Sequence, residues 1–313
     1  MTVLLLLKQG TFSTFWLWTV SYASVYATGL TPALGWLNFK SQLSEILASM
    51  SPYWGLAAAG LLTLAARRDA RGLLFTFLLL LASLVAICPG FHFRPHYFIL
   101  LLPAIALLAG ALLAGNFLPK TVRMALIAAF FAAAAFQLWQ ERWFLFAAPS
   151  QEYLKKAYQT TKPFVESAVV ADYVKSITAK NERILVMGSE PQIYFYADRL
   201  SATGHIYMYP LMEEQPYALG MQEEMLRQIS QSRPACLILV DDLSSWLSVS
   251  AEGQKFRERL GEFTRKNYEL AGVAAVSREN ASFYVFGERA RQFIPDSASR
   301  ILIYKLTKGA AGG

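Results

Sequence analysis

The sequence predicts a multi-span α-helical membrane region followed by a small extracytoplasmic α/β domain. The chain is 55% hydrophobic with a mean hydropathy of +0.32, and soluble proteins are about 45–50% apolar. Residues 1–149 hold three acidic and nine basic side chains, whereas residues 150–313 hold 19 and 20. In the second half, short apolar runs alternate with polar helical segments, which is typical of an α/β domain.

Four apolar stretches are predicted to cross a membrane: residues 51–66, 72–88, 96–115 and 122–146. A span needs about 20 apolar residues, so we expect the first of these helices to extend backwards into residues 41–50. These spans form the predicted segment 51–147. Residues 1–50 are expected to hold the end of a span and an outer interfacial segment, 12–37. A fifth span over 12–37 is the alternative, because this stretch carries no charge.

Short basic loops set the predicted orientation. The turn Arg67–Arg71 and the Lys120/Arg123 loop are expected to face the cytoplasm by the positive-inside rule. The loop 89–95 and everything after about residue 147 are then outside. We expect a multi-pass protein of a bacterial inner membrane with its C-terminal domain extracytoplasmic. The excess positive charge belongs to the membrane half, so no nucleic-acid partner is predicted.

The second domain is predicted over residues 150–308. Buried strands are expected at 184–188 and 235–240, a hairpin at 269–276 and 282–286, and a last strand at 301–304, in a partly parallel, doubly wound sheet. Ser189 is expected to cap the helix that follows the first strand. No GxGxxG motif follows either buried strand, and the cysteines and histidines lack metal-ligand spacing, so no cofactor or metal is predicted.

The outer loop Pro89–Tyr97 combines Arg94, His92 and His96 with aromatic residues. Arginine and imidazolium side chains suit a phosphate at headgroup depth. The same composition is also typical of an ordinary interfacial anchor, in which arginine extends toward the headgroups and aromatic rings form a belt.

Three acidic residues of the second domain are candidates for facing a substrate: Glu190, Asp241 and Asp242. The aspartates end a predicted strand, where open α/β sheets place ligands, and adjacent carboxylates can exchange protons or hold a cation. The structural alternatives are a helix cap for the aspartates and a first-turn acid that complements the helix dipole for Glu190.

Three stretches resemble a bacterial glycosyltransferase of the GT-C class, family-39 type. The family includes protein O-mannosyltransferases and the lipid A aminoarabinose transferase. The stretches are Thr14–Tyr22, the RxHYxxxxxP pattern of Arg94–Pro103, and Met187–Arg199 with Ser201–Thr203 after it. Their order and spacing cover most of residues 8–215, and the chain is similar to the C-terminal half of such an enzyme.

The resemblance implies transfer of a sugar from a polyprenyl-phosphate carrier to an acceptor at the outer membrane face, in contact with membrane lipid. It assigns Arg94, His96 and Tyr97 to the carrier phosphate. The family's catalytic base is an acid of an outer loop in an N-terminal half, and no catalytic residue is assigned here. We expect a truncated, split or mis-started gene product that is inactive alone and has the missing half as a partner.

A second hypothesis is a non-catalytic, membrane-anchored protein that binds a glycan or a protein partner. It predicts normal insertion and folding without transfer activity. A transporter component is a weaker third hypothesis, because such proteins carry intramembrane charges or broken helices in repeated halves. The spans predicted here have neither feature.

Overall fold

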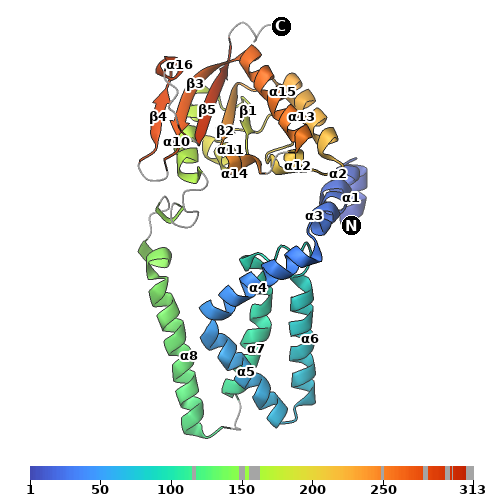
Figure 1. Cartoon of the computed structure of the whole chain (residues 1–313), viewed down its shortest axis with the longest axis vertical. Helices are drawn as coiled ribbons and strands as arrows, with labels where there is room; N and C mark the ends of the chain where they lie inside the picture. The colour runs from blue at the N-terminus through green and yellow to red at the C-terminus, as the bar shows by residue number, and fades with distance from the viewer. Residues whose placement is uncertain are drawn as a thin grey trace. The chain divides into compact units, whose positions relative to one another are not determined.

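The computed structural model describes residues 1–114, 118–147, 152–154, 163–247, 250–277, 281–292, 297 and 299–307. The chain divides into two compact units, Met1–Phe146 and Ala147–Gly313 (Figure 1). The first unit is helical, and the second is built on a small mixed sheet.

The first unit begins with short helices and continues with longer apolar ones. Its elements are α1 (Thr2–Lys8), α2 (Phe12–Trp16), η1 (Leu17–Ser21), α3 (Tyr22–Thr28), α4 (Pro32–Ser49), α5 (Ser51–Ala66), α6 (Ala70–Ala86), η2 (Pro95–Leu101), α7 (Leu102–Ala114), α8 (Lys120–Gln140) and η3 (Trp143–Ala147). Thr31 and Asp69 cap α4 and α6 through their side chains, as helix starts of this kind require.

Two helices among the described residues are long and apolar enough to cross a membrane, Pro95–Leu113 and Lys120–Gln140. The pair α4 and α5 meets the same criteria together, but the chain bends by 90° between them. Residues 41–50, into which the 51–66 helix was expected to extend, are helical but belong to α4 on the other side of this bend. Helix α6 has 17 residues, which at 1.5 Å per residue is about 25 Å, close to the thickness of a hydrocarbon core.

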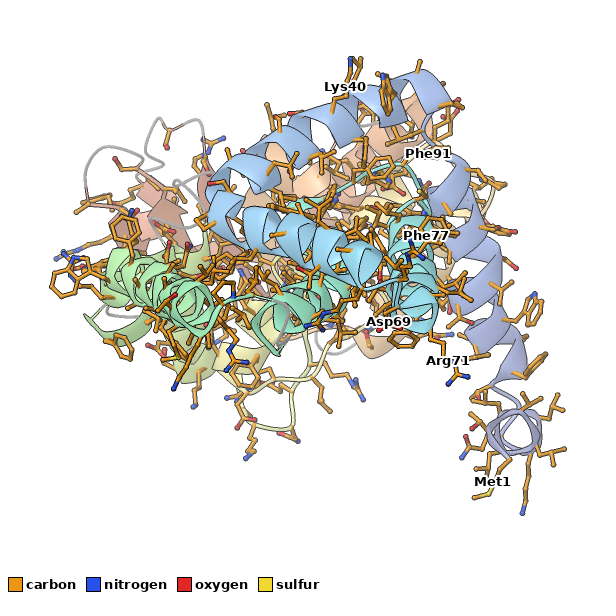
Figure 2. All side chains as sticks on the ribbon, turned by 90° about the horizontal axis from the view of Figure 1, so that it is seen from below. Met1, Lys40, Asp69, Arg71, Phe77 and Phe91 are labelled. Carbon is orange, nitrogen blue, oxygen red and sulfur yellow. The ribbon has the colours of Figure 1, made fainter. Side chains whose placement is uncertain are left out.

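Large apolar side chains cover the outside of the first unit. Side chains that are half exposed or more include Leu62, Leu74, Phe75, Phe77, Phe131 and Phe136. Exposed apolar surface on this scale is typical of helices that face lipid. Figure 2, which looks at the molecule from below, labels Asp69 in the turn between α5 and α6 and Arg71 at the start of α6. This turn lies at the opposite end of α6 from Phe91.

Helices α5 and α7 approach closely at Gly60. A Cβ atom on Gly60 would lie 1.8 Å from the carbonyl oxygen of Leu108, so only glycine permits this crossing, as in many membrane helix pairs. The crossing forms one side of an apolar core whose buried members are Ala57, Leu64, Ile87, Phe93, Phe98, Leu101, Ile105 and Leu108.

The second unit holds a five-stranded sheet of order β1-β2-β5-β3-β4. Its strands are β1 (Ile184–Met187), β2 (Cys236–Asp241), β3 (Tyr268–Ala275), β4 (Phe283–Phe286) and β5 (Arg300–Leu306). Its helices are α10 (Phe164–Ile177), α11 (Gln192–Ala197), α12 (Tyr209–Met212), α13 (Ala218–Ser232), α14 (Leu243–Trp246), α15 (Ala251–Asn267) and α16 (Arg289–Gln292).

Alternating residues of the strands bury both faces of this sheet. Val186, Ile238 and Ile303 pack with α10 and α11. On the other face, the hydroxyl of Thr264 in α15 lies 3.8 Å from the sulfur of Met187. Helices on both faces make the unit a three-layer α/β structure.

The predicted mixed sheet is confirmed, but its parallel part is limited to one pair. Strands β1 and β2 are parallel, whereas β5 pairs antiparallel with β2 and β3, and β3 with β4. The predicted cap at Ser189 is wrong. Pro191 stands at the N-cap of α11, and the Ser189 hydroxyl instead accepts from the backbone amide of Met208 at 3.3 Å.

Candidate functional site

The loop between α6 and η2 has an unusual backbone. Its φ angles are +80° at Gly90, +53° at Phe91 and +46° at Phe93. Positive φ is uncommon for residues with bulky side chains, and such strain persists only where the surroundings fix it, often at ligand sites. Phe93 directly precedes Arg94, and Phe91 lies two positions before Phe93.

Helix α4 holds this loop in place. A Cβ atom on Gly35 would lie 2.6 Å from the Cβ of Phe91, so the glycine lets the helix backbone approach the ring. The side-chain amide of Asn38 donates to the Phe91 carbonyl at 3.3 Å. Phe93 is buried and packs edge-on against Phe39, with ring centroids 5.1 Å apart. These contacts with α4 offset the backbone strain at Phe91 and Phe93, and they fix the position of Arg94, which follows.

Arg94 and the two other predicted carrier contacts lie at the start of the helix Pro95–Leu113. Arg94 and His96 are exposed, and Tyr97 is half-buried with its ring 4.7 Å from that of His96. The Tyr97 side chain lies beside that of Tyr26. Among the described residues, no acidic side chain forms an ion pair with Arg94. An uncompensated guanidinium and a helix N-terminus together favour an anion.

The third basic group of the loop has a different neighbour. His92 stacks on Tyr26, with ring centroids 4.5 Å apart and an interplanar angle of 20°. Tyr26 thus contacts the loop at His92 and at Tyr97. The sequence reasoning missed Tyr26, Gly35 and Asn38, because nothing in an uncharged, aromatic segment signals which of its residues meet a loop more than 50 positions away.

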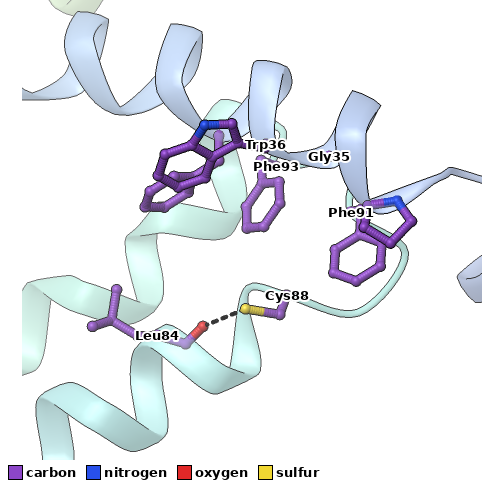
Figure 3. A pocket seen from close by; sticks show the side chains of 8 residues that line it. Gly35, Trp36, Leu84, Cys88, Phe91 and Phe93 are labelled. Carbon is purple, nitrogen blue, oxygen red and sulfur yellow. Dashed lines mark hydrogen bonds between the residues drawn. The ribbon is translucent and has the colours of Figure 1, made fainter.

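An apolar cavity of about 380 Å³ lies between α4, the end of α6 and the loop (Figure 3). Its lining residues are Pro32, Gly35, Trp36, Phe39, Leu84, Cys88, Phe91 and Phe93. The thiol of Cys88 donates to the Leu84 carbonyl at 3.1 Å, so the cavity presents little polar surface. A hydrocarbon chain suits such a lining, because burying apolar surface is its main source of affinity.

Glu190 in the second unit serves the local structure. It is 2% exposed, and the Ser245 hydroxyl donates to its carboxylate at 2.6 Å. A Cβ atom on Gly188 would lie 2.6 Å from the same carboxylate oxygen. The carboxylate therefore links the end of β1 to α14, and burial separates it from bulk solvent.

The two adjacent aspartates turn to separate partners. Asp241 accepts from Arg257 and from Arg300, each at 2.8 Å. Asp242 caps α14 by accepting from the backbone amide of Ser244 at 2.8 Å. The predicted helix cap is thus confirmed for Asp242, and the structure does not bring the two carboxylates together as a pair.

His205 is the buried histidine of the second unit. Its side chain is 4% exposed, and its Nε2 lies 3.5 Å from a carboxylate oxygen of Glu224. Burial lowers the pKa of His205 below its usual value, and the Glu224 carboxylate opposes this shift in part. At neutral pH the ring is neutral and part of the packed interior.

The candidate site is therefore the loop between α6 and η2 with its apolar cavity, and the three predicted acids of the second unit make structural contacts. No family model matches the sequence, and no curated protein or solved structure is significantly similar to it. The functional interpretation consequently depends on the geometry of the chain itself.

Proposed function

We propose that this chain takes part in transferring a sugar from a polyprenyl-phosphate-linked donor to an acceptor at the outer face of a bacterial inner membrane, with Arg94, His96 and Tyr97 holding the carrier phosphate. The observation that carries the proposal is the position of Arg94. It is exposed, it lies at a helix N-terminus, and it directly follows Phe93, which lines the apolar cavity. A lipid phosphate needs this combination of a cation and an apolar groove.

The proposal includes a topology. Helices α5, α6, Pro95–Leu113 and Lys120–Gln140 span the bilayer in this scheme, with the Arg67–Arg71 turn in the cytoplasm. The Arg94 loop and the second unit then lie outside. Phosphate recognition at the outer interface fits the arginine geometry, because guanidinium groups bind phosphate oxygens in a bidentate manner.

The direct test is binding of undecaprenyl phosphate to the full chain in lipid nanodiscs. Arg94→Gln should weaken binding about 10- to 100-fold, the loss expected when a charge-assisted hydrogen bond is removed. Arg71→Gln is the matched control, because it removes an exposed arginine at the other end of α6. Undecaprenol, which lacks the phosphate, should bind the wild-type chain and Arg94→Gln equally. Equal affinity of wild type and Arg94→Gln for undecaprenyl phosphate would remove the assignment.

A second candidate is a non-catalytic membrane-anchored protein that binds a glycan or a protein partner. The contacts of Glu190, Asp241 and Asp242 favour it, since each of these carboxylates accepts hydrogen bonds within the second unit. An experiment that distinguishes the two candidates is to reconstitute the chain with a complete polyprenyl-phosphate sugar donor and to measure release of the sugar. Carrier binding without any transfer, in every partner combination tried, would favour the second candidate.

A further inference from the structure

A second cavity in the first unit is polar, in contrast to the one beside Arg94. Its volume is about 460 Å³, within the range of about 300–1,000 Å³ that small-molecule sites occupy. It lies where the 90° bend between α4 and α5 faces α8. Its lining residues are Ala48, Ser49, Ser51, Pro52, Tyr53, Ala133, Phe136, Gln137, Gln140 and Glu141.

Helix α8 contributes one continuous face to this cavity. Its lining positions 133, 136, 137, 140 and 141 follow the i, i+3, i+4, i+7, i+8 spacing that aligns side chains on one side of a helix. The face is apolar at Ala133 and Phe136 and polar at Gln137, Gln140 and Glu141. Polar groups on a membrane helix are costly against lipid, so they face protein or a water-filled space and mark functional paths.

The bend between α4 and α5 supplies the opposite wall. Ser49 and Ser51 flank the bend, and the Tyr53 ring is fixed edge-on against Phe130 at 6.0 Å. The Ser49 hydroxyl donates to the carbonyl of Ile46 at 3.2 Å and keeps its oxygen lone pairs for a ligand. Hydroxyl, amide and phenol groups thus line this cavity together with the Phe136 ring.

The charge of the lining selects the ligand. Among the residues that the structure describes, Glu141 is the one charged residue of the lining, and no basic side chain lines the cavity. A phosphate or other anion is therefore disfavoured. The side-chain amides of Gln137 and Gln140 offer N–H donors as well as carbonyl acceptors. An ammonium ion has no acceptor and would leave these N–H donors without a partner. A neutral molecule that carries several hydroxyl groups, each both donor and acceptor, matches every polar group of the lining.

We propose that this cavity binds the pyranose ring of a sugar. The inference deepens the proposed function, on which it rests for its biological meaning, because it separates the sugar site from the lipid-phosphate site at Arg94. Gln137 and Gln140 hold the ring hydroxyls, and Glu141 accepts from one of them. Phe136 packs against the apolar face of the ring.

Ligand-observed NMR on the full chain in nanodiscs tests this site. The probes are the methyl glycosides of glucose, mannose, galactose and xylose, with tetramethylammonium as a cation probe. At least one glycoside should bind the wild-type chain, and Gln140→Leu should weaken it about tenfold, because a two-sided amide contact is lost. Thr121→Val, a similar loss of polarity at an exposed position of the same helix outside the cavity, should leave binding unchanged.

Other outcomes overturn the proposal. They are the absence of glycoside binding, equal binding by Gln140→Leu, and tetramethylammonium displacing the glycoside in a Glu141-dependent manner. The Glu141→Gln variant should weaken glycoside binding by no more than about tenfold, because the amide oxygen still accepts from the ring hydroxyl and only the charge assistance is lost. The lipid measurement separates the two proposals: glycoside binding without undecaprenyl phosphate binding removes the carrier site alone, and the reverse removes the sugar site alone.

Discussion

Replacing Gly60 with alanine should destabilise the first unit through one steric contact. The added Cβ would lie 1.8 Å from the carbonyl oxygen of Leu108 and 2.6 Å from its carbonyl carbon. Contacts of a real Cβ do not fall below 3.0 Å, so the oxygen must retreat by at least 1.2 Å. Because both atoms of Leu108 belong to a helix backbone, α5 and α7 must separate as whole elements.

The magnitude follows from two opposing effects. Overpacking of this kind costs about 1–3 kcal/mol, and rigid backbone neighbours favour the upper end. Alanine in a helix regains about 1 kcal/mol relative to glycine. We therefore expect a net loss of about 1–2 kcal/mol in the free energy of unfolding. The same separation should loosen the buried side chains Leu101 and Phe98, which lie beneath the Arg94 loop.

The assay is unfolding of the full chain in mixed micelles by titration with dodecyl sulfate, followed by far-ultraviolet circular dichroism. Gly55→Ala on α5 and Gly110→Ala on α7 are matched controls, because a Cβ at either position meets nothing within 4 Å. Both controls should be neutral or slightly stabilising. If Gly60→Ala unfolds at the same midpoint as these controls, the α5–α7 crossing is not as close as the reasoning requires.

Three further predictions concern the stability of the second unit, and each is tested by measuring amide hydrogen exchange of β1 and β2 in the full chain. Acidification should lower the protection factors of these strands, that is, their slowing of exchange relative to the intrinsic rate at the same pH, because the unfolded chain protonates His205 below about pH 6.5 while the buried ring resists protonation. The stability that the neutral His205 ring contributes is fully present above that pH and is lost as the pH falls toward the lowered pKa of the folded state. His205→Gln should abolish this pH dependence. Asp241→Asn should cost about 1–2 kcal/mol, since two half-buried arginines lose their carboxylate; exchange equal to wild type would contradict the pairing. Ser245→Ala should cost about 1–3 kcal/mol, because buried Glu190 loses a donor, and Ser230→Ala, at an exposed helix position, should not.

Much of the second unit was predictable, because its strands are local apolar runs. Ile184–Met187 and Cys236–Asp241 lie within a residue of their predicted bounds. The position of β5 between β2 and β3 was not predictable, since strand order is decided by pairing between distant segments. The structural roles of Glu190 and Asp241 were hidden for the same reason, as Ser245, Arg257 and Arg300 are far away in sequence.

The candidate site in the first unit was predictable in part. The composition of the loop Pro89–Tyr97 and the family resemblance together pointed to Arg94, His96 and Tyr97, but the strained backbone of this loop and its contact with Gly35 depend on tertiary packing. The polar cavity left a signal that could have been read. Gln137, Gln140 and Glu141 have the spacing of one helix face, at the end of an otherwise apolar helix.

The central claim is that the Arg94 loop and the second unit share one side of the membrane, opposite the turn between α5 and α6. Single cysteines at Arg68, Arg94 and Lys180, in a chain with Cys88 and Cys236 replaced by serine, test it with a membrane-impermeant maleimide. The account predicts that cysteines at positions 94 and 180 react in intact spheroplasts, whereas one at position 68 reacts only after permeabilisation. Labelling at position 68 in intact spheroplasts, with position 180 protected, would contradict it.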